Sequence, residues 1–188
     1  MMKREDHSAA STIQLRVQNI GQLFHTLDPL PFHERALDTA VEEYVVGWAG
    51  ELPADQPISI HVRYPPEATG HDDASHVVEA IHNYFDYRAA VMGWELRDLF
   101  RTGRASLMIG LAVLAACSIA GKLTTDRMDG QYIGRFLEEG FIILGWVANW
   151  RPVEIFLYEW WPISRRRALY QRLATARVKL IPETSNDR

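Results

Sequence analysis

Near the start of the chain, hydrophobic and polar positions alternate in two short segments. The first is TIQLRV at residues 12–17, and the second is PISIHVRYPP at residues 57–66, which two prolines close. A period of two with β-branched residues predicts strands. Between them, ALDTAVEEYVVGWAGELP at residues 36–53 has apolar positions at helical spacing and ends in Gly50 and Pro53. The apolar positions at this spacing are Ala36, Ala40, Tyr44, Val45 and Trp48. The order strand, helix, strand predicts a βαβ-type domain over residues 12–70.

After this domain the pattern turns helical and stays so. Residues 72–103 carry a rough apolar stripe without a strong breaker, which predicts a connecting amphipathic helix. The stripe consists of Val78, Ile81, Phe85, Val91, Trp94 and Leu99. Gly93 and Gly103 are tolerable interruptions, so we expect one long helix that continues into the apolar segment behind it.

Two apolar segments follow. Residues 105–121 contain no charge over 17 positions, about 26 Å of helix, which is at the short edge of what spans a bilayer. Residues 140–150 are also uncharged, and this second segment spans only if its helix takes in Arg135, Glu138 and Glu139. The short polar linker between the segments predicts a transmembrane helical hairpin over residues 104–150. The alternative is a soluble α-rich protein in which this hairpin is buried.

Aromatic and basic residues crowd the stretch NWRPVEIFLYEWWPISRRR, residues 149–167. Such residues collect where a membrane meets water, so we expect interfacial amphipathic helices over residues 151–178. In this interpretation Pro152 begins one helix, Pro162 ends it, and Ser164 caps the next. The predicted lipid-interface residues are Trp150, Arg151, Trp160, Trp161, Arg165, Arg166 and Arg167. The alternative is an aromatic core with an exposed basic rim. The ends, residues 1–11 and 179–188, are expected to be disordered.

Charge divides the chain unevenly. Residues 1–100 carry a net charge of −9 and residues 101–188 a net charge of +5, within an overall charge of −4. Basic residues flank the two apolar segments on their outer sides, which predicts that both termini are cytoplasmic. The N-terminal stretch lacks the apolar core of a signal peptide. The single Cys117 permits no internal disulfide and no multi-cysteine metal site.

No catalytic, cofactor-binding or metal site is predicted. The HDDASH stretch at residues 71–76 places its two histidines five apart, on different helix faces, and is interpreted as a helix cap. A denser loop, with Asp28, His33, Glu34 and Arg35, is either an interaction loop or an architectural helix start. Phosphate-loop and nucleophile motifs are absent from the sequence. The acidic front half argues against nucleic acid as a partner.

Two stretches carry a resemblance: LDPLPFHERALDTAVEEYVVGWAGELP at residues 27–53 and EEGFIILGWVANWRPVEIFLYEWWPISRRRALYQRL at residues 138–173. Together they resemble a family of small bacterial inner-membrane proteins to which no activity, cofactor or catalytic residue is assigned. The resemblance extends over residues 12–173. It implies a bacterial membrane protein and no particular reaction.

The sequence therefore predicts a helix-dominated α+β protein with a small βαβ-type domain, a long helix, a transmembrane hairpin and a C-terminal interfacial helix. The expected function is that of a non-enzymatic accessory or scaffold protein. Its expected partners are the lipid bilayer and either further copies of itself or a larger membrane complex. The alternative, from another class, is an oligomeric membrane enzyme or transporter component that uses Arg135, Glu138 and Glu139.

Overall fold

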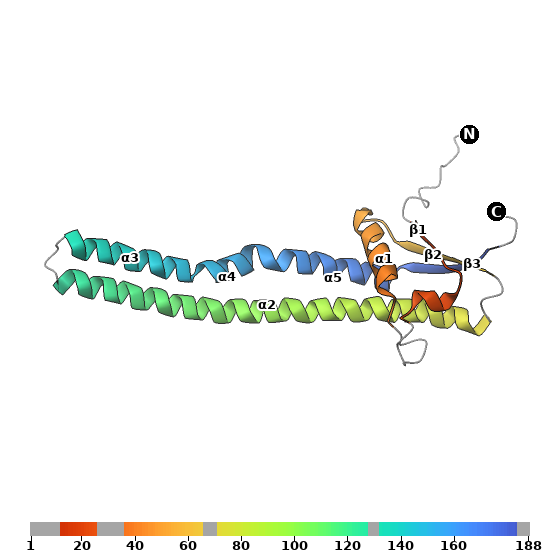
Figure 1. The fold of residues 1–188 in the computed structure, drawn as a ribbon, viewed down its shortest axis with the longest axis horizontal. Coiled ribbons are helices and arrows are strands. Elements are labelled where there is room, and N and C mark those ends of the chain that lie inside the picture. Colours follow the sequence, from red (N-terminus) through yellow and green to blue (C-terminus); the bar gives the residue numbers. More distant parts are fainter. Residues whose placement is uncertain (1–11, 26–35, 66–70, 128–131, 184–188) are drawn as a thin grey trace, which may run out of the picture. The chain divides into compact units, whose positions relative to one another are not determined.

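The computed structural model describes residues 12–25, 36–65, 71–127 and 132–183. The fold is helix-dominated α+β, with a small parallel sheet and one long helix (Figure 1). Its elements are β1 (Thr12–Arg16), the 3-10 turn η1 (Ile20–Leu23), α1 (Thr39–Glu51), β2 (Ser59–Tyr64), α2 (His71–Arg127), α3 (Tyr132–Ala148), α4 (Trp150–Glu154), the π-helical turn η4 (Ile155–Glu159), α5 (Trp160–Ala174) and β3 (Arg177–Pro182). The chain divides into two units. The first comprises residues 1–91 and 166–188, and the second comprises residues 92–165.

The sheet of the first unit has the strand order β1-β2-β3 with both pairs parallel. Ile13 lies opposite Ile60, and Ile60 lies opposite Val178 in register. Ile13, Ile60 and Val62 are buried, whereas the residues between them are more exposed. One face of the sheet therefore carries the core, as the alternation in the sequence predicts.

The third strand corrects the sequence analysis. Residues 151–178 were expected to be interfacial helices and residues 179–188 to be disordered, but Arg177–Pro182 form β3 beside β2. Ala176 donates its amide to the carbonyl of Leu173 as α5 ends, and Arg177 then bonds to the carbonyl of Ile58. A two-stranded sheet has little independent stability. The C-terminal strand supplies the third strand that the predicted βαβ unit lacked.

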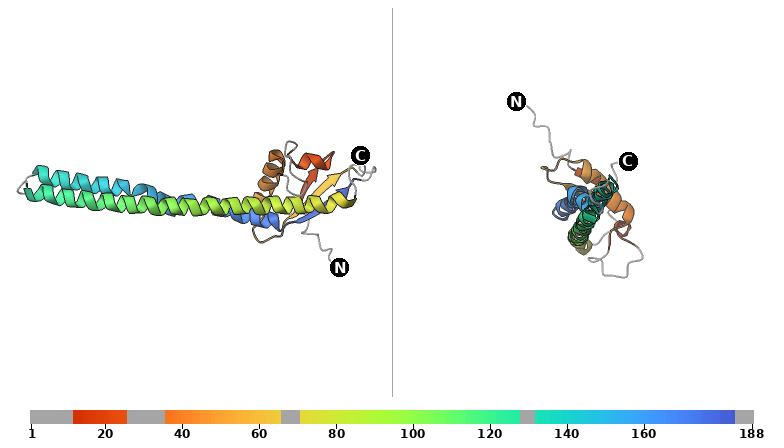
Figure 2. Two further views of the ribbon diagram at one scale, coloured as in Figure 1. Left: turned by 90° about the horizontal axis from the view of Figure 1, so that it is seen from below. Right: turned by 90° about the vertical axis from the view of Figure 1, so that its left-hand side faces the viewer.

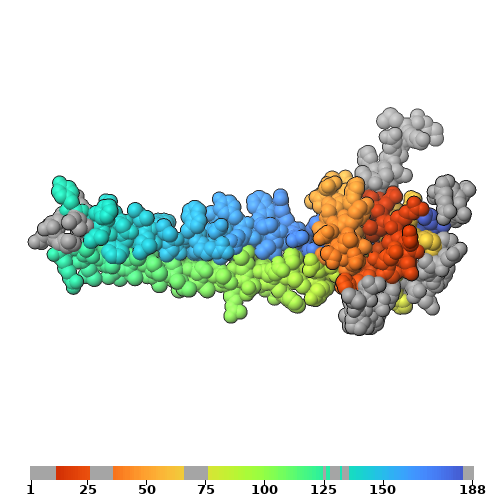
Figure 3. All heavy atoms as spheres, viewed as in Figure 1, coloured from red at the N-terminus to blue at the C-terminus, as the bar shows by residue number. Residues whose placement is uncertain are grey.

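Helix α1 buries only part of the apolar set that the sequence places at helical spacing. Val45 and Ala49 are buried, whereas Tyr44 and Trp48 are 44% and 50% exposed. The bulky aromatics suit a half-exposed surface, and the smaller pair permits close packing in the core. The atoms of residues 12–25 and 36–51, red and orange in Figure 3, lie directly against each other.

Helix α2 is one uninterrupted helix of 57 residues, which confirms the expected long helix. In the first unit, Ile81 and Phe85 of the predicted stripe are buried, and Val77, Ala80 and Ala89 are buried with them, whereas Val78 and Val91 are half-buried. Among the described residues, α2 contains the single segment that is long and apolar enough to cross a membrane, His76–Thr124. Its 18-residue window has a mean hydropathy of 1.9 and is only 11% buried.

In the second unit the later part of α2 lies beside α3, as two views agree (Figures 1 and 2). Glycines allow this close approach, because a Cβ at Gly110 would lie 2.6 Å from Asn149 Oδ1 and one at Gly145 would lie 3.1 Å from the Cα of Leu114. Asn149 is buried where α3 ends, and its Nδ2 donates to the carbonyls of Gly110 at 3.0 Å and Gly145 at 2.9 Å. This side chain links α2 to the break between α3 and α4.

Pro162 does not end a helix as expected. It lies in the first turn of α5, which continues to Ala174. Proline lacks the amide that would bond to the carbonyl four residues earlier, and it is tolerated where a helix segment begins. The preceding turn is π-helical over Ile155–Glu159, and the indole of Trp160 donates to the carbonyl of Phe156 at 3.0 Å. The change in register accommodates the proline without terminating the helical path.

Candidate functional site

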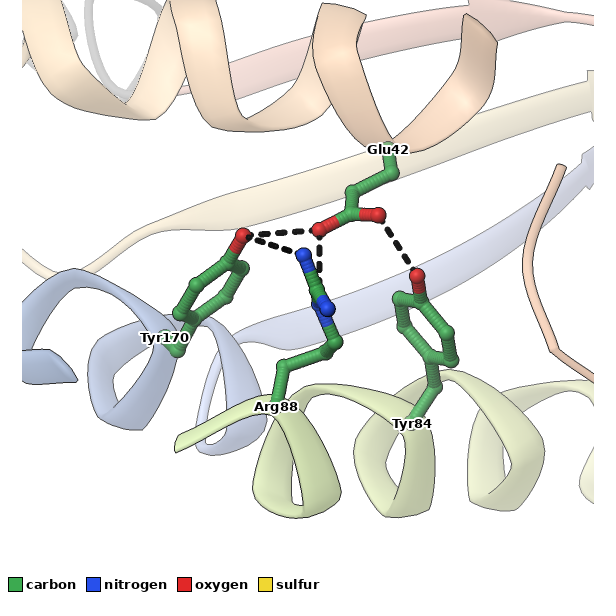
Figure 4. Close-up of polar contacts among 4 residues, drawn as sticks. All are labelled: Glu42, Tyr84, Arg88 and Tyr170. Carbon is green, nitrogen blue, oxygen red and sulfur yellow. Dashed lines mark hydrogen bonds and ion pairs between the residues drawn. The ribbon is translucent and has the colours of Figure 1, made fainter. Parts of the chain in front are cut away.

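The most developed polar cluster of the described chain lies in the first unit and centres on Glu42 of α1. Its helix begins at Asp38, whose carboxylate accepts a hydrogen bond from the Ala40 amide at 2.9 Å. This cap fixes the first turn of α1 and thereby the position of Glu42. Residues 84 and 88 of α2 and residue 170 of α5 meet it there (Figure 4).

Three donors converge on the Glu42 carboxylate. The Tyr84 hydroxyl donates at 2.6 Å, the Tyr170 hydroxyl at 2.7 Å and Arg88 Nε at 3.0 Å. Arg88 also lies over the Tyr170 ring, 5.4 Å from its centroid. The Glu42 side chain is 14% exposed and the Arg88 side chain 32% exposed. The cluster is thus largely removed from water, with each charge matched by a partner.

The electrostatics follow from this geometry. Burial raises the pKa of Glu42, but the hydrogen bonds from Tyr84 and Tyr170 and the charge of Arg88 outweigh it, so the net pKa lies below its ordinary value. Burial and the hydrogen bond to Glu42 raise the pKa of both Tyr84 and Tyr170. At neutral pH the carboxylate is ionised and both hydroxyls keep their protons.

This cluster suits holding elements together better than transferring protons. Its carboxylate is acidic and fully engaged, and neither tyrosine ionises near neutrality, so it offers no base or nucleophile poised for reaction. A hollow of about 170 Å³ adjoins it. The residues lining the hollow are Thr39, Glu42, Glu43, Val46, Arg88, Arg166 and Tyr170. The network ties α1, α2 and α5 of the first unit to one another.

A second hollow of about 340 Å³ lies in the same unit, at the loop between α1 and β2. Arg172 lines it and donates to the carbonyls of Pro53 at 2.8 Å and Gln56 at 3.1 Å. These bonds use Nη2 of the arginine to hold the loop. The hollow is therefore bordered by a guanidinium that already has a structural role.

The predicted lipid-interface residues of the second unit lie on one run of helix. Trp150 is 71% exposed and Trp161 is 54% exposed. Trp160 stacks on Trp161 with 6.5 Å between ring centroids, and the Arg165 guanidinium lies 5.2 Å from the Trp161 ring centroid. Arg151 pairs with Glu154 at 3.1 Å and also with Glu159. The pairing of Arg151 with two carboxylates was not foreseen.

The other two predicted interface residues, Arg166 and Arg167, belong to the first unit. Arg166 is exposed and lines the hollow beside Glu42. Arg167 is half-buried, and its Nε has no hydrogen-bond partner within the described chain. The three consecutive arginines are thus distributed over different surroundings.

Several predicted residues cannot be compared with the structure. Asp28, His33, Glu34 and Arg35 lie outside the described residues, and so do the side chains of residues 71–75 and 135. Glu138 is half-buried and lies close to Gly121: a Cβ added to Gly121 would lie 3.3 Å from the Cγ of Glu138. Glu139 is exposed. Over the residues that are described, no group of three or more histidine, cysteine, aspartate or glutamate side chains is placed to hold a metal ion.

Sequence reasoning missed the Glu42 cluster because its members are far apart in the chain. Glu42 and Tyr170 are separated by 128 positions. The spacing of Tyr84 and Arg88 by four residues does place them on one helix face, but no signal in the sequence connects that face to α1 and α5.

No family model matches the chain, and no curated protein or solved structure matches it either.

Proposed function

We propose that this chain is an integral membrane protein, with a transmembrane hairpin over residues 104–150, that acts as a non-enzymatic accessory or scaffold protein through contacts with other proteins. In this proposal the first unit and both termini are cytoplasmic. The bilayer is the partner of the second unit, in a bacterial inner membrane.

The observation that carries the proposal is the exposed apolar surface of the second unit. Large apolar side chains of α2 and α3 that are more than half exposed include Met108, Ile109, Ile119, Leu123, Phe136, Ile143, Leu144, Trp146 and Val147. So much exposed apolar surface is unfavourable in water and favourable against acyl chains. The 18-residue window in α2 buries only 11% of its positions within the chain, which supports lipid rather than protein as its surroundings.

The residues that follow α3 support a boundary with water. Trp150, Tyr158 and Trp161 are more than half exposed, and large aromatic rings with polar tips are favoured at headgroup level. Arg151 and its carboxylate partners, Glu154 and Glu159, form ion pairs that reduce the cost of charge near lipid. Residues 150–165 therefore fit an interfacial helix, with the hairpin ending at their start.

The accessory role is supported by how the ionisable groups are used. In the described part of the chain, the best-formed buried polar cluster has its charge and hydrogen bonds satisfied internally. Such a cluster stabilises a domain that presents a surface. Replacement of Glu138 and Glu139 by glutamine tests the transporter or enzyme alternative. Membrane insertion and growth should both be unchanged. A defect in transport or growth with intact insertion would contradict the accessory role.

Membrane insertion is tested by extraction of isolated membranes at alkaline pH and by flotation with liposomes. The full chain should remain with the lipid. Ile109→Arg combined with Ile119→Arg should lose most membrane recovery, because both side chains are more than 60% exposed and arginine near the bilayer centre costs about 2.5–3.5 kcal/mol each.

The matched control is Tyr87→Arg, which adds one arginine at a position of the first unit that is 60% exposed. It should float like the wild type. A wild-type chain that stays monodisperse in detergent-free buffer and ignores liposomes would overturn the membrane assignment.

A further inference from the structure

Among the described residues, the topology of the sheet places the helices that connect its strands on one face. The strand order follows the sequence order, and both pairs are parallel. Connections between parallel strands are right-handed, so two successive crossovers in the same direction place their helices on the same face. The burial of Ile13, Ile60 and Val62 marks that covered face.

The opposite face is basic. Register places Gln14, His61 and Lys179 in one row and Arg16, Arg63 and Ile181 in the next, while Arg177 begins β3 on the same side. We call Arg16, His61, Arg63, Arg177 and Lys179 the basic sheet face. No aspartate or glutamate occurs in the three strands, although the chain as a whole has a net charge of −4.

Two of these basic residues lack an ion-pair partner among the described residues. Arg177 and Lys179 are exposed, and neither forms an ion pair with a residue that the structure describes. The Nε atom of Arg63 is buried without a hydrogen-bond partner within the same residues. Basic residues gathered on one face with little compensation repel one another. An anionic partner would reduce this repulsion.

One carboxylate of the chain itself already binds here. Glu183 follows β3 at the position that alternation assigns to the same face as Arg177 and Lys179. Its Oε2 accepts hydrogen bonds from Arg16 Nε at 3.2 Å and from Arg16 Nη2 at 2.9 Å. The Arg16 side chain remains 68% exposed. This pair shows the kind of contact, guanidinium to carboxylate, that the face can make.

We propose that the basic sheet face binds an acidic segment of a partner protein in extended conformation. Alternate residues of an extended chain repeat at about 6.6 Å, which is also the spacing of Arg177 and Lys179 along β3. A face three strands wide is about 10 Å across, enough for one such segment. Among the described residues of this face, His61 is the single aromatic side chain and is half-buried, so the face offers little surface on which successive bases could stack, which disfavours single-stranded nucleic acid. The proposal rests on the proposed accessory function, for which it names the contact surface.

The test uses the purified full chain in uncharged detergent and a fluorescein-labelled twelve-residue peptide of alternating glutamate and serine. Fluorescence anisotropy should show saturable binding that weakens as salt rises from 50 to 300 mM, because the contacts are exposed ion pairs. The glutamine–serine peptide should not bind.

Two variants of the face and one control variant locate the site. Arg177→Gln combined with Lys179→Gln should weaken binding at least tenfold, and both positions are exposed, so folding should be retained. Adding Arg63→Gln should weaken it further. Arg166→Gln removes a charge from an exposed position of α5, off the sheet, and should change affinity less than twofold.

Three outcomes would overturn the proposal: no binding by the folded wild type, equal loss in the Arg166→Gln control, or an unchanged affinity in the double variant. A fourth outcome would also overturn it: the wild type binds oligothymidine or anionic vesicles but not the peptide, and the double variant abolishes that binding. The face would then be assigned to that other anion. The assay does not involve the bilayer, so failure of membrane insertion leaves its result interpretable.

Discussion

Replacement of Glu42 by glutamine should loosen α1 from the first unit. Glutamine keeps the shape of the side chain but removes the charge. Its amide nitrogen cannot accept a hydrogen bond, so one of the three donors, Tyr84, Tyr170 or Arg88, would lose its acceptor. Hydrogen bonds to charged groups contribute about 1.5–3 kcal/mol and neutral ones about 0.5–1.5 kcal/mol. Three bonds of 2.6, 2.7 and 3.0 Å are affected.

The summed loss is about 3–4 kcal/mol on that basis, but Arg88 is 32% exposed and water can replace part of its contact. We therefore expect a loss of about 2–3 kcal/mol in the free energy of opening, which corresponds to roughly 30- to 150-fold faster amide exchange. The measurement is hydrogen–deuterium exchange of α1, residues 39–51, in the full chain under conditions where exchange reports the opening equilibrium.

The matched control is Glu43→Gln. Glu43 is the next residue and is exposed. Its side chain makes no hydrogen bond or ion pair with the described residues. It should change exchange of α1 less than threefold. Exchange in Glu42→Gln within threefold of the wild type, or equal acceleration in both variants, would refute the view that the cluster holds α1 in place.

The pH dependence provides an independent check on the same residue. The pKa of Glu42 is lower in the folded chain than its ordinary value of 4.5, so its stabilising contribution is present above that value and is lost as pH falls through the folded pKa. Opening of α1 in the wild type should therefore become easier below about pH 4.5. The Glu42→Gln variant should lack this acid-dependent component.

Two further predictions concern the tyrosines and the glycine contact. In an ultraviolet titration, Tyr84 and Tyr170 should ionise above the ordinary pKa of tyrosine, because burial and the Glu42 hydrogen bond raise their pKa values. Gly110→Ala places a Cβ 2.6 Å from Asn149 Oδ1 and should destabilise the second unit by about 1–3 kcal/mol, seen as a lower Tm in detergent. Gly140→Ala, which meets nothing within 4 Å, should be neutral or stabilising.

The elements with a clear local pattern were predictable from the sequence. The alternation in residues 12–17 and 57–66 predicted β1 and β2 nearly to their ends, and the uninterrupted helical pattern predicted α2. β3 was missed although RVKLIP alternates Val178 and Leu180 with Arg177 and Lys179. The basic run at residues 165–167 favoured an interfacial helix for the whole segment. The alternation that indicates a strand was therefore overlooked.

The remaining features of the fold and of the candidate site depend on tertiary contacts, which could not be predicted from the sequence. Nothing local indicates that residues 42 and 170 share a hydrogen bond, or that Arg16 meets Glu183 across the sheet. Tyr44, Val45 and Trp48 all have helical spacing in the sequence, yet only Val45 of the three is buried, together with Ala49. Volume available in the core decides such cases, and the sequence alone does not specify it.

The position of β3 at residues 177–182 has a consequence for biosynthesis. The ribosome releases this strand only after all of α2 through α5 has been made, so until then β2 has an unpaired edge on the nascent chain. If the hairpin is first delivered to the bilayer, closure of the sheet becomes the final step of maturation. Deletion of residues 177–182, or a fusion that prevents them from pairing with β2, would then leave the protein in the membrane with its sheet incomplete and its first unit open to proteases.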